Sequence, residues 1–307
     1  MAPRLIAVVG ATGTQGGAVA RLLLQWPEEY RVRAITRNTT SEAAEALLSA
    51  GAEVFQADQN DEDQMNDAFE GCWGVFAVTT SYDPAVIKRP ELEEEHGRTM
   101  ARAASRSGVE CYVWSTLPSS KQLTRGEVEA RIYDSKHLVD AYIQELGLPS
   151  TFILTATFYE NLITRKHAVY IKDEDRIEFR HPVIEEDTGL QMVWIEKDLS
   201  AIVKAVLDEW DAKKDELNHQ YLFASSGRVT YSDLVHLIQK VSGKPTKYVL
   251  ETSSGIPERD KLFKMYNRFK QNYPGFVAPD PQVLALGVRL AEPEDFVRER
   301  ILPALGL

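Results

Sequence analysis

The sequence lacks the features that mark several specialised classes of protein. Among its 307 residues are two cysteines, Cys72 and Cys111, too few for a disulfide framework, and we interpret both as small buried apolar residues rather than redox groups. No apolar run reaches the roughly 20 residues that cross a bilayer, so we expect no membrane partner. The first residues lack the basic segment and apolar core of a secretory signal. We therefore expect a cytoplasmic protein, with the nucleus as a second location.

Positive charge is also scarce. The chain has 35 Lys and Arg against 46 Asp and Glu, which gives a formal net charge of −11. A protein that binds DNA directly needs a surplus of basic side chains to displace counterions, so we expect no direct contact with nucleic acid. The sequence also lacks a metal-ligand spacing of His, Cys, Asp and Glu and a Gly-x-Ser-x-Gly elbow, which argues against metalloenzymes and hydrolases.

Strand-like and helix-like segments alternate through the first half of the chain. Strands of this apolar composition, separated by helix-length segments, suit a parallel sheet with helices on both faces. We therefore predict an α/β fold built on a doubly wound parallel Rossmann sheet with right-handed connections. The predicted strands are residues 5–9, 31–36, 52–57, 73–80, 110–116 and 150–155.

The pattern changes after about residue 156, where short charged and aromatic pieces replace the regular alternation. A helix is predicted at 230–243, bracketed by Thr230 as a start signal and Gly243 as a stop signal. We predict a larger domain from residues 1–157, with contributions from about 190–225. Residues 158–189 and 226–307 are then expected to form a smaller α/β domain that covers the carboxyl edge of the sheet, where such folds bind ligands. Further helices are predicted at 196–210, 256–273 and 292–302.

Three glycines follow the first predicted strand. Gly10, Gly13 and Gly16 form a G-x-x-G-x-x-G series between that strand and a helix. Residues without Cβ let the backbone reverse and approach a pyrophosphate, and the helix N-terminus offers free N–H groups. We therefore predict a dinucleotide site, the alternative being an ordinary tight turn. Three polar residues of the loop are expected beside the phosphates: Thr12, Thr14 and Gln15.

The end of the second predicted strand bears on which dinucleotide binds. Sites that select NAD place an acid there, whereas this strand ends in Thr36 followed by Arg37. A guanidinium matches the oxygens of a 2′-phosphate, so we predict NADP, the alternative being an exposed arginine on a polar turn. After the third strand, Asp58 and Gln59 are expected at the adenine edge, unless Asp58 caps the next helix.

The sequence departs from the Tyr-x-x-x-Lys pattern that short-chain dehydrogenases carry on one helix. The only such spacing is Tyr266 to Lys270, which we interpret as a solvated helix face far from the sheet. On the helix after the fifth strand, Tyr133 lies three residues before Lys136, and Ile132 occupies the expected tyrosine position. This offset turns the side chain by about 100° around the helix axis.

Lys136 is the strongest catalytic candidate, with an ordinary surface lysine as the alternative. Its ammonium could hold a cofactor, polarise a carbonyl or donate a proton. The preceding strand delivers Ser115 to the same edge, and Tyr133 could assist. The fourth strand ends in Thr79 and Thr80, whose hydroxyls would line the cleft or cap the segment that follows.

Together these segments resemble the NmrA-like family, atypical short-chain dehydrogenases related to isoflavone reductase-like proteins. The resemblance implies an NADP-binding Rossmann domain with Arg37 on the 2′-phosphate and Lys136 facing the nicotinamide. It also implies that Tyr159 and Asn161 lie near the nicotinamide, the alternative being a rigid aromatic hinge. The matching segments are the glycine loop, "TRN" at 36–38, "ADQND" at 57–61, the helix around Lys136, "FYENL" at 158–162 and "TYSDLVHLIQKVSGKP" at 230–245.

The resemblance implies two classes of function. The first is an NADPH-dependent oxidoreductase that reduces a small carbonyl or an activated double bond, with Lys136 as electrophile or proton donor. The second is a non-catalytic NADP(H) redox sensor that regulates a transcription factor or another protein partner. Lys136 and its neighbouring hydroxyls favour the enzyme, whereas Ile132 in the tyrosine position favours the sensor.

Overall fold

The main sheet of the protein is parallel and has helices on both faces. The computed structural model describes residues 2–81 and 83–307. Within these ranges the sheet has seven strands in the order β11-β6-β5-β4-β1-β2-β3. The order in which successive strands are added reverses next to β1, as it does in doubly wound folds. Six strands fall where the apolar runs predict them, and β11 returns from the second half of the chain. The strands are β1 (Arg4–Val9), β2 (Tyr30–Thr36), β3 (Glu53–Gln56), β4 (Gly74–Ala77), β5 (Cys111–Thr116), β6 (Ser150–Thr155) and β11 (Tyr221–Ala224).

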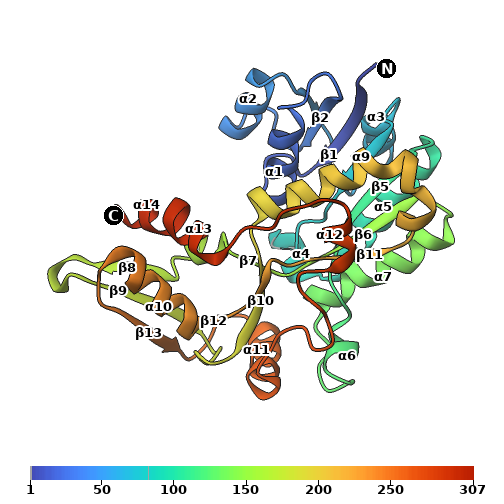
Figure 1. The fold of residues 1–307 in the computed structure, drawn as a ribbon. Helices are drawn as coiled ribbons and strands as arrows, with labels where there is room; N and C mark the ends of the chain where they lie inside the picture. Colours follow the sequence, from blue (N-terminus) through green and yellow to red (C-terminus); the bar gives the residue numbers. More distant parts are fainter. Residues whose placement is uncertain (1, 82) are drawn as a thin grey trace.

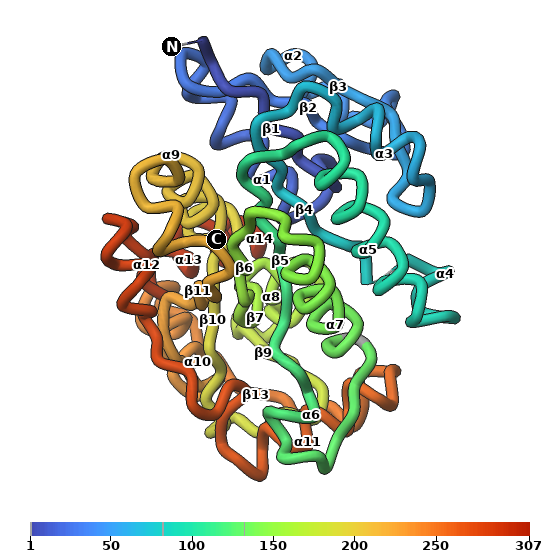
Figure 2. The backbone as a smooth tube through the Cα atoms, turned by 90° about the vertical axis from the view of Figure 1, so that its right-hand side faces the viewer, coloured from blue at the N-terminus to red at the C-terminus, as the bar shows by residue number. Residues whose placement is uncertain are grey.

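Two apolar layers fix the helices to the sheet. One layer joins the sheet to α1 and α9, and the other joins it to α3, α5 and α7, which lie on the opposite side in Figure 2. Cys72 and Cys111 are both buried in these layers, as predicted. The helices of this region are α1 (Thr14–Leu23), α2 (Glu42–Ser49), α3 (Glu62–Phe69), α4 (Pro84–Lys88), α5 (Glu91–Arg106), α6 (Ser120–Leu123), α7 (Arg131–Glu145) and α9 (Ser200–Leu217).

Most of the remaining elements form a second region below the main sheet in Figure 1. It contains two three-stranded sheets, β12-β10-β7 and β13-β9-β8, among the described residues. Its strands are β7 (Thr157–Phe158), β8 (Ala168–Ile171), β9 (Arg176–Pro182), β10 (Gly189–Val193), β12 (Gly227–Thr230) and β13 (Thr246–Glu251). Its helices are α8 (Asn161–Thr164), α10 (Tyr231–Ser242), α11 (Pro257–Phe269), α13 (Pro293–Phe296) and α14 (Leu302–Leu305). Helix α12 (Pro281–Ala285) instead packs against β11 of the main sheet.

Helix α10 shows how local chemistry sets these boundaries. The Thr230 side chain accepts a hydrogen bond from the backbone N–H of Asp233, whose carboxylate in turn accepts from the backbone N–H of Thr230. Gly243 ends the helix with a φ of 70°, a conformation that suits glycine. Both predicted end signals are therefore confirmed. In the part of the chain that the structure describes, no helix is long and apolar enough to cross a membrane.

Candidate functional site

A cavity of about 550 Å³ lies along the carboxyl ends of the main strands and continues between the elements of the second region. Its first part follows β1, β2, β3 and β4, and its second part lies among residues from β6 to α11. Lys136 and Tyr133 border the same space. The predicted cofactor residues that line the cavity are Gly10, Thr12, Gly13, Thr14, Gln15, Gly16, Arg37, Asp58, Gln59, Thr79, Thr80, Lys136 and Asn161.

The glycine loop has the close backbone approach that its sequence predicts. Gly10 has a φ of 63°, and a Cβ added at Gly16 would collide with the carbonyl group of Gly10. Helix α1 begins within the glycine series, with Gly13 as its cap residue, and no side chain in the described ranges caps it. The first-turn N–H groups are therefore free to bind an anion at the cavity wall.

Two hydrogen bonds hold this loop against the sheet. The Thr12 hydroxyl lies 3.2 Å from the Thr36 hydroxyl at the end of β2. The Ser115 hydroxyl of β5 donates to Gln15 Oε1 at 2.7 Å. Ser115 has an exposed fraction of 1% and is not among the described residues that line the cavity. The structure therefore places Ser115 behind the loop, where it positions Gln15.

Arg37 stands at the mouth of the cavity. Its side chain is 58% exposed, and its Nη1 atom contacts Asp83 Oδ2 at 2.6 Å. The hydrogen bond from Arg37, together with the backbone N–H of Ala85, holds the pKa of the Asp83 carboxyl below its usual value. Because the contact is exposed to solvent, it is weak, and an anion of higher charge can displace Asp83.

The end of β3 settles one of the open alternatives. The carboxylate of Asp58 accepts from the backbone N–H of Asn60, and helix α3 is capped by Asp61. The alternative that Asp58 caps this helix is therefore wrong, because Asp61 occupies that position. Gln59 donates to the carbonyl oxygen of Val78 at 3.2 Å, which joins β3 to the end of β4 beside the cavity.

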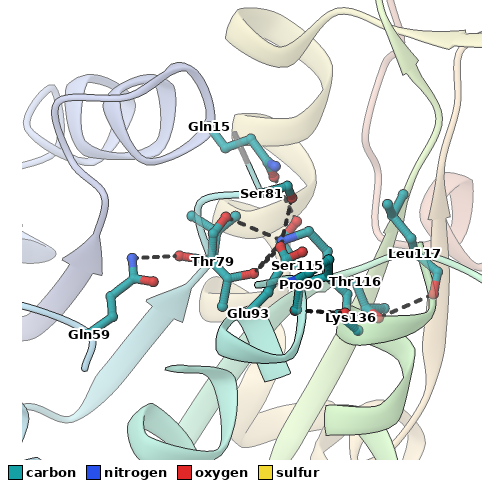
Figure 3. A network of polar contacts seen from close by, with 12 residues as sticks. Gln15, Gln59, Thr79, Ser81, Pro90, Glu93, Ser115, Thr116, Leu117 and Lys136 are labelled. Carbon is teal, nitrogen blue, oxygen red and sulfur yellow. Dashed lines mark hydrogen bonds and ion pairs between the residues drawn. The ribbon is translucent and has the colours of Figure 1, made fainter. Parts of the chain in front are cut away.

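Lys136 is buried in an ion pair, so the alternative of an ordinary surface lysine is wrong. Its Nζ lies 2.7 Å from Glu93 Oε1 and donates to the Thr79 carbonyl at 3.2 Å and to the Thr79 hydroxyl (Figure 3). The side chains of Lys136 and Glu93 are 6% and 2% exposed. An ammonium has three N–H donors, and these three acceptors match them in number.

The same carboxylate gathers the hydroxyls at the end of β4. Thr79 and Ser81 donate to Glu93 Oε1 at 2.7 and 2.6 Å. Burial raises the pKa of Glu93, but the Lys136 ammonium and the two hydroxyls outweigh it and hold that pKa below its usual value. Glu93 is therefore ionised. Thr80 is exposed at the cavity wall and does not cap α4, whose cap is Asp83.

Tyr266 corrects the interpretation of its helix face as solvated. It is 3% exposed in α11, and its hydroxyl lies 2.7 Å from the hydroxyl of Tyr133 on α7. Burial, together with the neighbouring Tyr133 and Tyr273, raises the pKa of Tyr266 well above its usual value. The sequence suggests a surface because charged residues surround Tyr266, but α11 folds this side against the cavity. Tyr266, Tyr273 and Tyr133 all line it.

The "FYENL" segment divides between the cavity and the core. Phe158, Asn161 and Leu162 line the cavity. Tyr159 is 2% exposed and stacks on Phe296 at 5.1 Å, within the apolar core of the second region. The structure does not bring Tyr159 to the cavity, because its ring packs into that core from the turn after β7. The alternative, a rigid aromatic hinge where the chain leaves the sheet, describes the position of Tyr159.

Sequence reasoning missed several residues in or beside the cavity. Glu93 carries a usable signal, since it falls at helical spacing with the buried Gly97 and Met100 on one face of α5. His167 and His181 carry none, because they lie in a short-stranded segment without a regular motif. In the described ranges no group of three or more His, Cys, Asp or Glu is arranged to hold a metal ion.

Known proteins resemble this chain in sequence and in fold. The model that matches residues 3–268 is that of the NmrA-like family. The NmrA-like family domain-containing oxidoreductase FrzB of Cladobotryum sp. is 33% identical over 299 residues, which cover 90% of this chain and 87% of FrzB.

Two solved proteins show the same architecture at lower identity. NmrA, a negative transcriptional regulator, aligns with a TM-score of 0.82 and 22% identity over 99% of this chain and 98% of its own; NmrA has also been crystallised with NADP. The NADPH-dependent quinone oxidoreductase QOR2 of Escherichia coli, complexed with NADPH, aligns with a TM-score of 0.70 and 20% identity over 97% and 99% of the two chains. The family match over most of the chain and the identity to FrzB lead to one conclusion: this protein belongs to the NmrA-like family.

Proposed function

We propose that the protein is an NADPH-dependent oxidoreductase that reduces a small carbonyl or an activated double bond. The observation that carries the proposal is a single cavity that joins the glycine loop and Arg37 to Lys136 and the Tyr133–Tyr266 hydroxyl pair. The oxidoreductase name of FrzB and the NADP(H) complexes of NmrA and QOR2 support it.

The residues at the first part of the cavity fit a dinucleotide phosphate. The surface left open by Gly16 and the uncapped first turn of α1 suit a pyrophosphate. Arg37 offers a planar fork of donors for a 2′-phosphate once it leaves Asp83. Bound NADPH would supply the hydride, and the protein must then supply a proton and stabilise the charge that develops on the substrate.

We assign the proton to Tyr133. Its hydroxyl borders the cavity and is hydrogen-bonded to Tyr266, whose raised pKa keeps that second hydroxyl protonated. A hydrogen bond from Tyr266 would stabilise the negative oxygen left on Tyr133 after proton transfer. This arrangement replaces the usual tyrosine geometry with a tyrosine pair drawn from α7 and α11.

Lys136 then acts chiefly through its position. Its three donors already face Glu93 and Thr79, so donating its own proton would break a buried ion pair. Lys136 lies one helical turn from Tyr133, and its contacts with Thr79 fix this part of α7 against the segment after β4. Lys136 is therefore a positioning residue in this mechanism.

The same ion pair supports a second candidate, a non-catalytic NADP(H) sensor. A site that only binds a cofactor has no need of a lysine with a free donor, and the three donors of Lys136 have acceptors. The two candidates differ in one measurable respect, because only the enzyme oxidises NADPH in the presence of a suitable acceptor.

The test is steady-state NADPH oxidation with a panel of ketones, enones and quinones. We expect turnover in the wild type and a loss of kcat of about 10²- to 10⁴-fold in Tyr133→Phe, with NADPH affinity retained in a fluorescence titration. Tyr266→Phe should lower kcat by less, since it removes only the supporting hydrogen bond. Tyr142→Phe, on the same helix α7, is the matched control and should leave kcat unchanged. NADPH binding without turnover across the panel would reject the enzyme in favour of the sensor.

A further inference from the structure

The second part of the cavity is lined by basic and aromatic side chains. We call it the basic aromatic compartment and define it by Arg165, His167, His181, Tyr231, Arg259 and Phe263. These residues come from the segment after α8, the end of β9, the start of α10 and the first turns of α11. A neighbouring hollow of about 620 Å³ shares five of them, all but Tyr231, so the compartment extends beyond the cofactor end of the site.

Flat rings form one wall of this compartment. The ring of His181 lies 4.5 Å from that of His167, 4.6 Å from that of Tyr231 and 5.5 Å from that of Phe263. Each imidazole donates its Nδ1–H to a backbone carbonyl, of Arg180 for His167 and of Pro182 for His181. Such a wall suits a planar, aromatic ligand.

The two imidazoles are neutral at physiological pH. Burial, followed by nearby positive charge, lowers the pKa of His167 to about 4 and that of His181 well below its usual value. Arg165 and Arg259 both lower these pKa values, and both residues line the same cavity as the two rings. The wall therefore combines uncharged rings with a positive potential.

Near the rings, no carboxylate is among the described residues that line the main cavity, and one, Glu251, lines the adjoining hollow. The acids that line the main cavity within the described ranges are Asp58 and Asp83, both at the Arg37 end. Asp260, next to Arg259, accepts hydrogen bonds from Ser253 and Ser254. A positive wall is notable in a chain with a net charge of −11.

One buried N–H donor of Arg259 has no hydrogen-bond partner among the described residues. Its Nη2 donates to the Ser254 carbonyl at 3.0 Å, whereas its Nε is buried without a hydrogen-bond partner among the described residues. A buried donor without a partner is costly, so an acceptor brought by a ligand would be favourable there. A carboxylate is the acceptor that matches a guanidinium best.

We propose that the substrate is a planar aromatic molecule that carries an acidic group. Arg259, assisted by Arg165, binds the acid, and the ring lies against His181, Tyr231 and Phe263. This inference deepens the proposed function and rests on it, since the substrate shares its cavity with NADPH.

The test compares the binding of 2-naphthoate with that of its uncharged analogue 2-naphthamide by calorimetric titration. Saturating NADP⁺ is present to occupy the anion-binding site at the glycine loop. We expect the wild type to bind naphthoate at least about tenfold more tightly than naphthamide, the preference that one charge-assisted hydrogen bond supports. Arg259→Met should reduce this preference to about twofold or less, and Arg259→Lys should restore part of it.

Arg268→Met is the matched control, because Arg268 lies on the same helix α11 but is exposed and paired with Glu127. It should leave both affinities unchanged. Equal binding of the two probes, binding of neither, or naphthoate binding that NADP⁺ abolishes would each overturn the proposal. Failure of the proposed function is separately visible, because it would appear as absent NADPH binding or turnover while the preference for naphthoate persists.

Discussion

At the residue scale, the buried ion pair between Lys136 and Glu93 lies at the wall of the cavity. Both groups are almost fully buried, so each depends on the other for compensation of its charge. The pair also fixes Thr79 and Ser81, which follow β4 at the cavity wall. Its removal therefore affects both stability and the shape of the site.

We predict that Glu93→Gln lowers the free energy of unfolding by about 3–5 kcal/mol, since it leaves the Lys136 ammonium buried without a counter-charge. The double variant Glu93→Gln/Lys136→Met should recover much of this loss, because no charge remains buried. Urea denaturation measures both. Glu94→Gln, which removes a partly exposed pair with Arg98, is the control and should cost at most about 1 kcal/mol. A Glu93→Gln effect no larger than that of Glu94→Gln would contradict the prediction.

Arg37 gives a second prediction at this scale. Because its fork is expected to bind the 2′-phosphate, Arg37→Gln should weaken NADPH binding about 10- to 100-fold and change NADH binding little. Asp83→Asn should have the opposite sign for NADPH, since it frees Arg37 and removes a nearby negative charge. Fluorescence titration with both nucleotides measures this, with the exposed Arg31→Gln on the same strand as the control. Equal losses for NADPH and NADH in Arg37→Gln would show that Arg37 does not recognise the phosphate.

At the element scale, the turn from β1 into α1 depends on the absence of one side chain. A Cβ at Gly16 meets the backbone of Gly10 and Val9, which cannot rotate away as a side chain can. At Gly17 the nearest atom is the far end of the Arg21 side chain, at 3.0 Å. We therefore predict that Gly16→Ala shifts the loop and weakens NADPH binding at least about tenfold, a loss of about 1.4 kcal/mol or more.

Gly17→Ala is the matched comparison for this effect and should weaken NADPH binding by a smaller factor. Circular dichroism should show that both variants keep the helix content of the wild type. The result that would contradict the prediction is a Gly16→Ala variant that binds NADPH as tightly as the wild type.

The elements also show what the sequence could predict and why the rest was out of reach. Strands β1 to β6 and the ends of α10 follow from local periodicity and capping, which act within a few residues. The contact between Tyr133 and Tyr266 joins residues 133 positions apart on two helices, and neither helix shows by its own pattern that it faces the other. The prediction for Tyr159 is wrong for a different reason. Tyr159 follows β7, and a strand of this length has no alternation from which an inward face can be predicted.

At the scale of the whole molecule, the chain crosses between its two regions more than once. Strand β10 pairs with β7 and β12, and the chain then returns through α9, which packs on α1, to β11 of the main sheet. We therefore propose two domains. The first comprises residues 1–157 and about 190–225, and the chain returns to its sheet after Val193. The second comprises residues 158–189 and 226–307. Because the cavity is lined from both regions, a ligand that fills it joins them and should stabilise them together.

Stability against acid is a property of the whole fold to which two buried groups contribute with opposite sign. The pKa of His167 falls from 6.5 to about 4, mainly through burial, so the unfolded chain binds a proton in this range that the folded chain does not. This contribution to stability is lost as the pH falls from 6.5 to 4. Burial raises the pKa of Asp198 from 3.8 to about 6, so here the folded chain binds the extra proton and gains stability over nearly the same range.

We predict that these two contributions, each about 3 kcal/mol over its full range, largely cancel in the wild type. His167→Gln removes the destabilising contribution, so its free energy of unfolding should fall less steeply than that of the wild type between pH 6.5 and 4. Asp198→Asn removes the stabilising contribution and should make the fall steeper. Urea denaturation at several pH values gives each slope, and comparing slopes rather than absolute values separates titration from the hydrogen bonds that each substitution alters. Parallel curves for the three proteins would mean that neither group titrates differently in the folded and unfolded chain.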